Sequence, residues 1–136
     1  MDAWVIALLV CFVGALVTFA VQRHNAYRAA STKLRGTFTS TLADVYPLPV
    51  RWPGNVDAFL RNAFPPLQAA VAEFRPHLPW YKRRGFDQAW FEYRCSTGRE
   101  IDLQCYHHYM AISGQPDPKQ MFRFNIDRVL SYAGPL

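Results

Sequence analysis

Two cysteines and two histidines are the side chains whose types and spacing best suit metal or thiol chemistry: Cys95, Cys105, His107 and His108. A structural zinc site needs four nitrogen or sulfur ligands, usually in paired short spacings. Cys105 and His107 would share one face of a strand, and Cys105 and His108 one face of a helix. Neither conformation supplies four ligands. We therefore predict no cofactor here and expect buried thiols and surface histidines.

Known catalytic motifs are missing around these residues. The chain contains no G-x-S-x-G, H-E-x-x-H, P-loop or dinucleotide-binding motif. Asp102 near His107 is a generic acid–base pair without a nucleophile. We expect no catalytic residues. The alternative function is a metal- or thiol-dependent membrane-bound enzyme using Cys105, His107 and His108. A disulfide between Cys95 and Cys105 is expected only if this part of the chain lies outside the cytoplasm.

The composition is that of a folded protein. Of 136 residues, 51% are hydrophobic, 15% are aromatic and only 18% are charged. Such values exclude an intrinsically disordered or collagen-like chain. Three cysteines are too few for a disulfide-dense secreted scaffold. The 15 Lys and Arg exceed the 10 Asp and Glu, which gives a net charge of +5.

The strongest single pattern is an uncharged apolar run, WVIALLVCFVGALVTFAV, over residues 4–21. As a helix this run would span roughly 27 Å, close to the bilayer hydrocarbon thickness of about 30 Å. A cleaved signal peptide would have cations before the run and a small-residue cleavage motif. A buried core helix would keep a polar face, and a type IV pilin stem would have a basic leader and a nearby glutamate. We therefore predict a transmembrane helix at 4–21.

The cations that flank this run predict its orientation. Arg23, Arg28, Lys33 and Arg35 follow it, and no Lys or Arg precedes it. The positive-inside rule then places the N-terminus outside and the rest of the chain in the cytoplasm, at a bacterial inner membrane. We expect the same four cations to face anionic lipid headgroups, at about 1 kcal/mol each. A periplasmic body is the alternative orientation.

Small residues recur along one side of the predicted span. They are Ala7, Cys11, Gly14, Ala15 and Thr18. Small residues at four-residue spacing let two transmembrane helices approach closely. This stripe is therefore a candidate contact with another membrane protein or with a second copy of the chain.

The rest of the sequence predicts a mainly α protein, with a small helical bundle after the single transmembrane helix. We expect a juxtamembrane helical arm at 22–45, interrupted near Gly36. A Pro-rich linker follows at 46–54, and a helical body at 55–136. Residues 37–45 and 99–110 fit both helix and strand, with helix favoured for 37–45.

Local signals place the helices of the body. Asn55 and Asp117 are predicted N-caps, and Pro79 is suited to the first position of a helix. The Pro65–Pro66 pair is expected to break or kink the helix that contains it. Helical spacing predicts that two apolar faces point inward: Phe86, Ala89, Trp90 and Tyr93 on one helix, and Phe122, Ile126, Val129 and Leu130 on the last.

An aromatic and basic segment precedes the first of these faces: Trp80, Tyr81, Lys82, Arg83 and Arg84. Aromatic rings beside cations can bind single-stranded nucleic acid. Without Asp2 and the four anchor-flanking cations, however, the chain has 11 basic and 9 acidic residues. This near balance makes nucleic-acid binding the weaker explanation. We predict instead an exposed partner-contact surface at this segment and at Tyr106–Tyr109.

Residues 53–110 resemble a group of small uncharacterised bacterial proteins that have an N-terminal hydrophobic segment. The shared pattern is AV..F, an aromatic or Pro-rich turn, basic residues, and F..AW..Y. Here it is formed by Ala70, Val71, Phe74, Leu78, Lys82, Arg83, Phe86, Ala89, Trp90 and Tyr93. The resemblance implies a membrane-anchored helical architecture. It implies no activity and no functional residues, because the family has no assigned activity.

Together these patterns predict a non-enzymatic, single-pass membrane protein. Its helical body would lie in the cytoplasm and act as an interaction or accessory module, with membrane lipid and another membrane protein or a second copy as partners.

Overall fold

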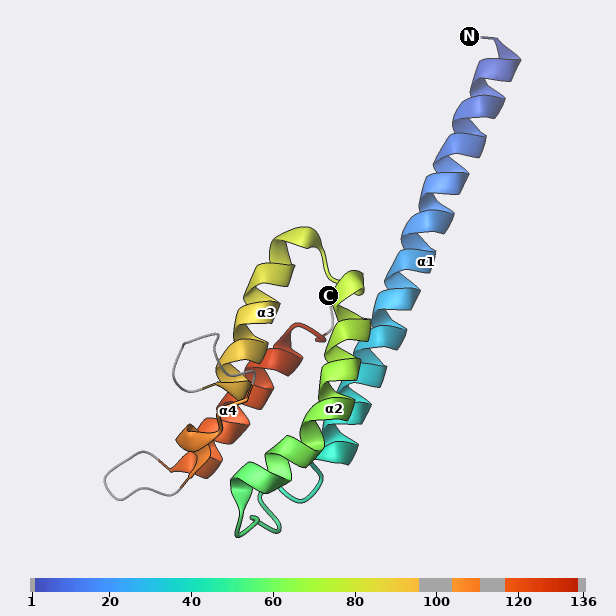
Figure 1. Cartoon of the computed structure of the whole chain (residues 1–136). Coiled ribbons are helices and arrows are strands. Elements are labelled where there is room, and N and C mark those ends of the chain that lie inside the picture. The colour runs from blue at the N-terminus through green and yellow to red at the C-terminus, as the bar shows by residue number, and fades with distance from the viewer. Residues whose placement is uncertain (1, 96–103, 111–116, 135–136) are drawn as a thin grey trace.

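The computed structural model describes residues 2–95, 104–110 and 117–134, and within these ranges the chain is mostly helical. The α-helices are α1 (Ala3–Thr41), α2 (Val56–Phe74), α3 (Trp80–Arg94) and α4 (Pro118–Ser131), with short 3-10 helices η1 (Arg75–His77) and η2 (His107–Tyr109). The chain runs down α1, up α2, down α3 and up α4 (Figure 1). A long apolar N-terminal helix followed by a helical bundle confirms the predicted fold class.

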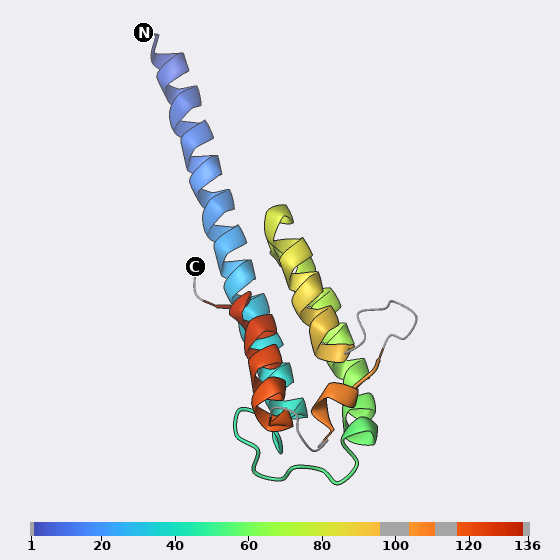
Figure 2. The ribbon, with the colours of Figure 1, turned by 90° about the vertical axis from the view of Figure 1, so that its left-hand side faces the viewer.

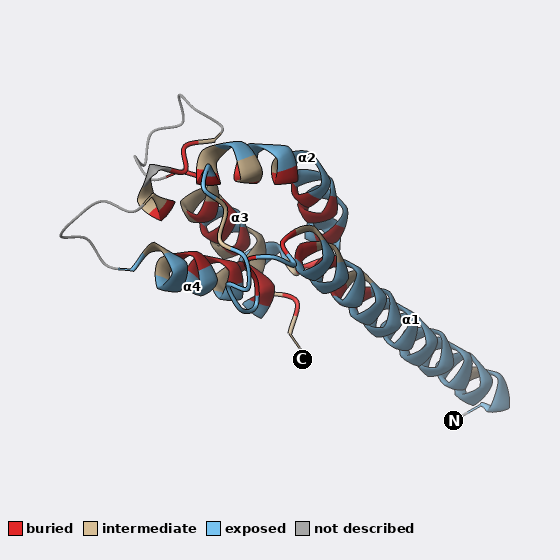
Figure 3. Cartoon of the chain, turned by 90° about the horizontal axis from the view of Figure 1, so that it is seen from below, coloured by how far each residue is buried: buried red, intermediate tan, exposed pale blue. Residues whose placement is uncertain are grey.

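Helix α1 consists of two halves with different surroundings. Its first half projects from the bundle, as Figures 1 and 2 show. There even large apolar side chains such as Phe12 are exposed. Its second half packs into the bundle through Tyr27, Leu34 and Phe38, which are buried. Figure 3 shows this change along α1, from exposed residues to an alternation of exposed and buried ones.

The packed half of α1 lies in the stretch expected to form a juxtamembrane arm. Leu34, Phe38, Leu42 and Val45 are each buried, because their spacing of three or four residues keeps them on one side of the chain. The sequence did not predict that this stretch supplies core side chains. Gly36 does not interrupt α1, so that expectation was wrong, and residues 37–41 are helical as favoured.

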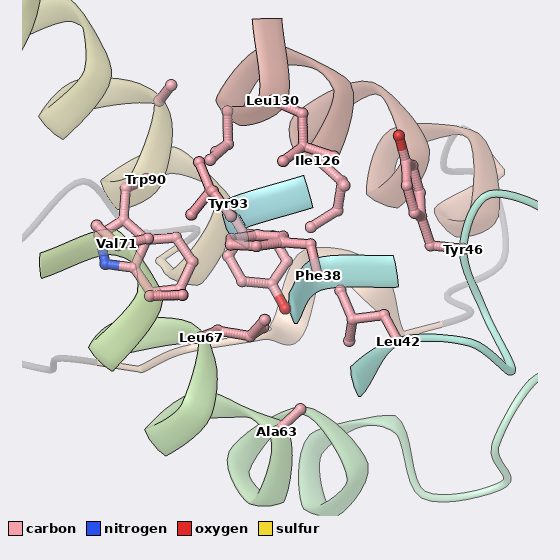
Figure 4. Packing of buried hydrophobic residues seen from close by; sticks show 14 of the residues in the cluster. Phe38, Leu42, Tyr46, Ala63, Leu67, Val71, Trp90, Tyr93, Ile126 and Leu130 are labelled. Carbon is pink, nitrogen blue, oxygen red and sulfur yellow. The ribbon is translucent and has the colours of Figure 1, made fainter. Parts of the chain in front are cut away.

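Phe38 lies at the centre of the core. In Figure 4 it stands between Leu67 of α2 and Ile126 of α4, with Trp90 and Tyr93 of α3 beside it. Its ring meets the Trp90 ring edge-on, with the centroids 6.0 Å apart. Phe38 therefore packs on α3 and belongs to the same buried cluster as side chains of α2 and α4. Such aromatic pairs add to the stability gained from burial.

Most local signals placed the helix ends correctly. The side chain of Asn55 accepts a hydrogen bond from the Ala58 backbone N–H at 3.1 Å, and Asp117 accepts one from Lys119 at 3.0 Å. Pro79 is the residue before α3 and not its first residue. Helix α2 continues through Pro65–Pro66 and bends part-way along (Figure 1), so the kink is present and the break is not. Buried residues on both sides of the proline pair hold the two parts together.

Part of the ambiguous 99–110 segment is described. Residues 99–103 lie outside the described ranges. Cys105 pairs with Cys95 in an isolated parallel β-bridge, and its backbone N–H donates to the Arg94 carbonyl at 2.7 Å. A 3-10 turn follows at His107–Tyr109. The described part is therefore neither a regular strand nor an α-helix.

Candidate functional site

The α2–α3 turn lies against α1 at the point where its apolar run ends. Ala20, Arg23 and Tyr27 of α1 line a shallow hollow together with His77 and Pro79 of the turn. Figure 1 shows the turn at the end of the bundle from which the free half of α1 emerges. The α2–α3 turn therefore lies level with the end of the apolar run of α1.

This turn leads into the segment predicted to contact a partner. Trp80 and Tyr81 are 81% and 65% exposed, and their rings pack edge-on at 5.9 Å. Arg84 is also exposed, whereas Lys82 and Arg83 are half-buried. The exposed surface predicted here is therefore present at both aromatic residues.

Arg83 holds the turn in place. Its Nε donates to the Leu78 carbonyl at 3.1 Å, and its Nη2 donates to the Pro76 carbonyl at 3.2 Å. Leu78 itself is fully buried. Arg83 therefore closes its own turn, and this structural role differs from the partner contact predicted for it.

The second predicted contact surface, Tyr106–Tyr109, was wrong at its two tyrosines. Tyr106 is 1% exposed and Tyr109 is fully buried. The Tyr109 hydroxyl donates to the Tyr93 carbonyl at 2.7 Å and accepts from the Asn125 side-chain amide at 3.0 Å. These rings belong to the core because α3 and α4 converge on the 3-10 turn that carries Tyr109.

Burial changes the acidity of this tyrosine cluster. Desolvation raises the pKa of Tyr93, Tyr106 and Tyr109, since a phenolate is poorly solvated inside the bundle. The pKa of Tyr46 is also raised, to about 12, first by burial and then by its hydrogen bond to Asp127. The Tyr46 hydroxyl donates to Asp127 Oδ1 at 2.6 Å. All four side chains therefore stay protonated at neutral pH.

The four cations predicted to face lipid headgroups divide into two pairs. Lys33 forms an ion pair with Glu73 of α2 at 2.6 Å. Arg35 donates to the carbonyls of Leu130 and Ala133 at the end of α4. Arg23 and Arg28 are exposed, and among the described residues neither forms an ion pair. Arg23 and Arg28 are therefore the pair best placed for headgroups.

The cysteines and histidines of the candidate metal site are brought together only in part. Cys95 and Cys105 are both buried, and their backbones pair directly. The ring of His108 lies 3.7 Å from that of Tyr109. Within the described part of the chain, no three His, Cys, Asp or Glu side chains form a group suited to a metal ion. The His107 side chain lies outside the description, so the thiol or metal alternative stays a prediction.

The stripe of small residues lies on the free half of α1. Ala7, Cys11, Gly14, Ala15 and Thr18 are all exposed. The Thr18 hydroxyl donates to the Gly14 carbonyl at 2.9 Å, so this hydroxyl is satisfied within the helix. The stripe is therefore open to another helix.

Two features of the bundle were missed by reasoning from the sequence. The Tyr27 hydroxyl donates to the Tyr132 carbonyl at 2.6 Å, and with Arg35 it fastens the end of α4 to α1. Leu48 and Val50, in the segment between α1 and α2, are 60% and 82% exposed. The proline content of that segment predicts a linker and gives no sign that apolar side chains are exposed there.

Comparison of the chain with protein-family models, with curated proteins and with solved structures gave no match.

Proposed function

We propose that the chain is a single-pass, membrane-anchored interaction module that holds its helical bundle at the cytoplasmic face of a bacterial inner membrane. The observation that carries the proposal is the continuity of α1. This helix has 39 residues, and its most apolar 18-residue window has a mean hydropathy of 2.7 and no buried residue. The later part of the same helix packs into the bundle. An apolar helix surface of this length is stable in lipid and costly in water.

The packed half of α1 couples the bundle to its anchor without a flexible joint. Tyr27 and Arg35 bind the carboxyl end of α4, and Lys33 pairs with Glu73 of α2. A helix stiffened by such contacts transmits its orientation to the domain it enters. The bundle would therefore have a fixed height and direction relative to the membrane.

The cytoplasmic orientation is supported by charge. Arg23 and Arg28 lie exposed just past the apolar run, where the positive-inside rule places cations. Anionic headgroups of the inner leaflet would bind them, with about 1 kcal/mol for each.

The end of the bundle far from the anchor supplies the candidate contact with a protein partner. Figure 2 shows the segment between α1 and α2 at the opposite end of the bundle from the free half of α1. Leu48 and Val50 are exposed there, while Tyr46 is held to Asp127. Apolar side chains presented on an ordered segment lose little conformational entropy on binding.

Two experiments test this proposal in living bacteria. A C-terminal alkaline phosphatase fusion is expected to be inactive, and a C-terminal fluorescent-protein fusion to be fluorescent. A photo-crosslinking amino acid replaces Val50 in the full chain, with Thr39, exposed on α1, as the matched position. We expect a discrete crosslinked species from Val50 that Thr39 does not give. An active phosphatase would contradict the orientation, and equal crosslinking at both positions would contradict the interaction surface.

A further inference from the structure

We infer that the α2–α3 turn is a second membrane contact. Trp80 and Tyr81 would lie among the lipid headgroups of the cytoplasmic leaflet, at the level where the apolar run of α1 ends. This inference rests on the proposed membrane anchoring. It assigns the aromatic segment to lipid and not to a protein partner.

The position of the α2–α3 turn along α1 supports this inference. Pro79 and His77 line one hollow with Ala20 and Arg23, so the turn lies beside the last apolar turn of α1 and its first cation. If α1 crosses the bilayer, this is the level at which hydrocarbon gives way to headgroups. Trp80 follows Pro79 directly and is the first residue of α3. Figure 1 shows that α3 begins at the end of the bundle from which the free half of α1 emerges.

The spacing between aromatic residues also fits the two interfaces of a bilayer. Trp4 lies at the other end of the apolar run, sixteen positions before Ala20. That separation corresponds to roughly 24 Å of helix, similar to the hydrocarbon core of about 30 Å. Trp and Tyr are enriched at both membrane interfaces, because an amphipathic ring prefers the headgroup level. Trp4 and the Trp80–Tyr81 pair would mark the two interfaces of one bilayer.

Trp80 and Tyr81 are exposed on a turn that is held in place by hydrogen bonds. Trp80 and Tyr81 are 81% and 65% exposed, although each aromatic side chain gains substantially from leaving water. Arg83 closes the turn through the Leu78 and Pro76 carbonyls, and Leu78 is fully buried. The two rings therefore lie outside the core, on a turn that hydrogen bonds and a buried side chain hold in place.

The charges at the start of α3 also favour contact with anionic lipid. Lys82, Arg83 and Arg84 follow Trp80 in the first turns of α3, and the first turn of that helix has no acidic residue. Cations at a helix N-terminus are unfavourable because the helix dipole is positive there. Anionic headgroups would offset this repulsion and would also bind Arg23 on α1, beside the same turn. The electrostatics of this end of the bundle therefore fit an anionic lipid surface.

The test uses the full chain reconstituted in vesicles of phosphatidylcholine and phosphatidylglycerol with brominated acyl chains, which quench nearby tryptophan fluorescence. The Trp80→Phe variant isolates the Trp80 emission by difference, and Trp4→Phe isolates that of Trp4. Both positions are exposed, so neither change removes core packing. We expect the Trp80 emission to be lower in brominated than in unbrominated lipid, because an indole at headgroup level lies close to the acyl chains. Water-soluble iodide should quench it weakly.

The two variants separate failure of this inference from failure of the anchoring. If Trp4 emission is quenched by lipid and Trp80 emission is not, α1 is inserted and the second contact is refuted. If neither emission is quenched by lipid, the anchoring itself fails, and this inference fails with it. Trp80 emission that is shielded from iodide but insensitive to brominated lipid would show a protein surface over the turn and would also overturn the inference.

Discussion

The guanidinium of Arg35 closes the end of α4 by donating from Nη2 to the Leu130 carbonyl at 2.7 Å. Its Nε donates to the Ala133 carbonyl at 2.9 Å. The last carbonyls of a helix have no partner within the helix, so an arginine from α1 supplies one and also favours the negative end of the helix dipole. The first and last helices of the chain are thereby joined.

Replacing Arg35 with Gln should destabilise the bundle. Loss of two charge-assisted hydrogen bonds at a partly exposed site should lower the free energy of unfolding by about 1–3 kcal/mol. Arg28→Gln is the matched control, because its side chain is exposed and forms no ion pair among the described residues. Denaturant unfolding of the full chain in mild detergent measures both. Equal stability of the two variants would refute the role given to Arg35.

The two halves of α1 should respond differently to the same substitution. Phe38 is fully buried, so Phe38→Ala should lower the free energy of unfolding by about 3–5 kcal/mol. Phe12 is 63% exposed on the free half, and Phe12→Ala should leave the unfolding of the bundle nearly unchanged. The same unfolding measurement in detergent compares them. A large loss of bundle stability from Phe12→Ala would contradict the division of α1.

The buried tyrosines predict a loss of stability in alkali. The folded pKa of Tyr46 is raised to about 12, and burial also raises that of Tyr93 and Tyr109. Above the ordinary tyrosine pKa of about 10, the unfolded chain has released protons that the folded chain still holds. The stabilisation is therefore complete below that pH and is lost as the pH rises towards 12 for Tyr46.

Unfolding free energies measured at a series of pH values, with phenolate absorbance recorded in parallel, test this dependence. Tyr46→Phe should make the decline above pH 10 shallower, since one of the responsible groups is gone. Tyr81→Phe, at an exposed position, is the matched control. If Tyr46→Phe leaves the slope unchanged, Tyr46 is not one of the groups whose raised pKa stabilises the folded chain.

The fold class and most helix ends could be predicted because they depend on local sequence. Asn55 and Asp117 cap their helices through neighbouring backbone groups, and the apolar faces of α3 and α4 follow helical spacing. Each of these signals lies within a few residues of the structure that it determines. The uncharged run of α1 is likewise a continuous feature of the sequence.

The features that escaped prediction depend on which elements meet. Tyr27 and Arg35 lie in a polar, basic stretch, and their role appears only once α4 ends beside them. Tyr106 and Tyr109 stand next to histidines, yet both are buried against Tyr93 of α3, and Tyr109 also packs on Phe122 of α4. The position of His77 and Pro79 beside the end of the apolar run depends on the length of α2, which returns the chain along α1. None of these contacts leaves a periodic signal.

The most direct test of the account uses Cys11, which lies exposed in the middle of the apolar half of α1. Membranes opened to both faces are treated with a hydrophilic maleimide, and Thr39→Cys, exposed on the packed half, is the matched position. Peptide mass spectrometry reads the labelling at each position. We expect the cysteine at position 39 to be labelled rapidly, and Cys11 to stay unlabelled until dodecyl sulfate dissolves the membrane. Equal labelling of both cysteines in intact bilayers would show that water, and not lipid, surrounds the first half of α1.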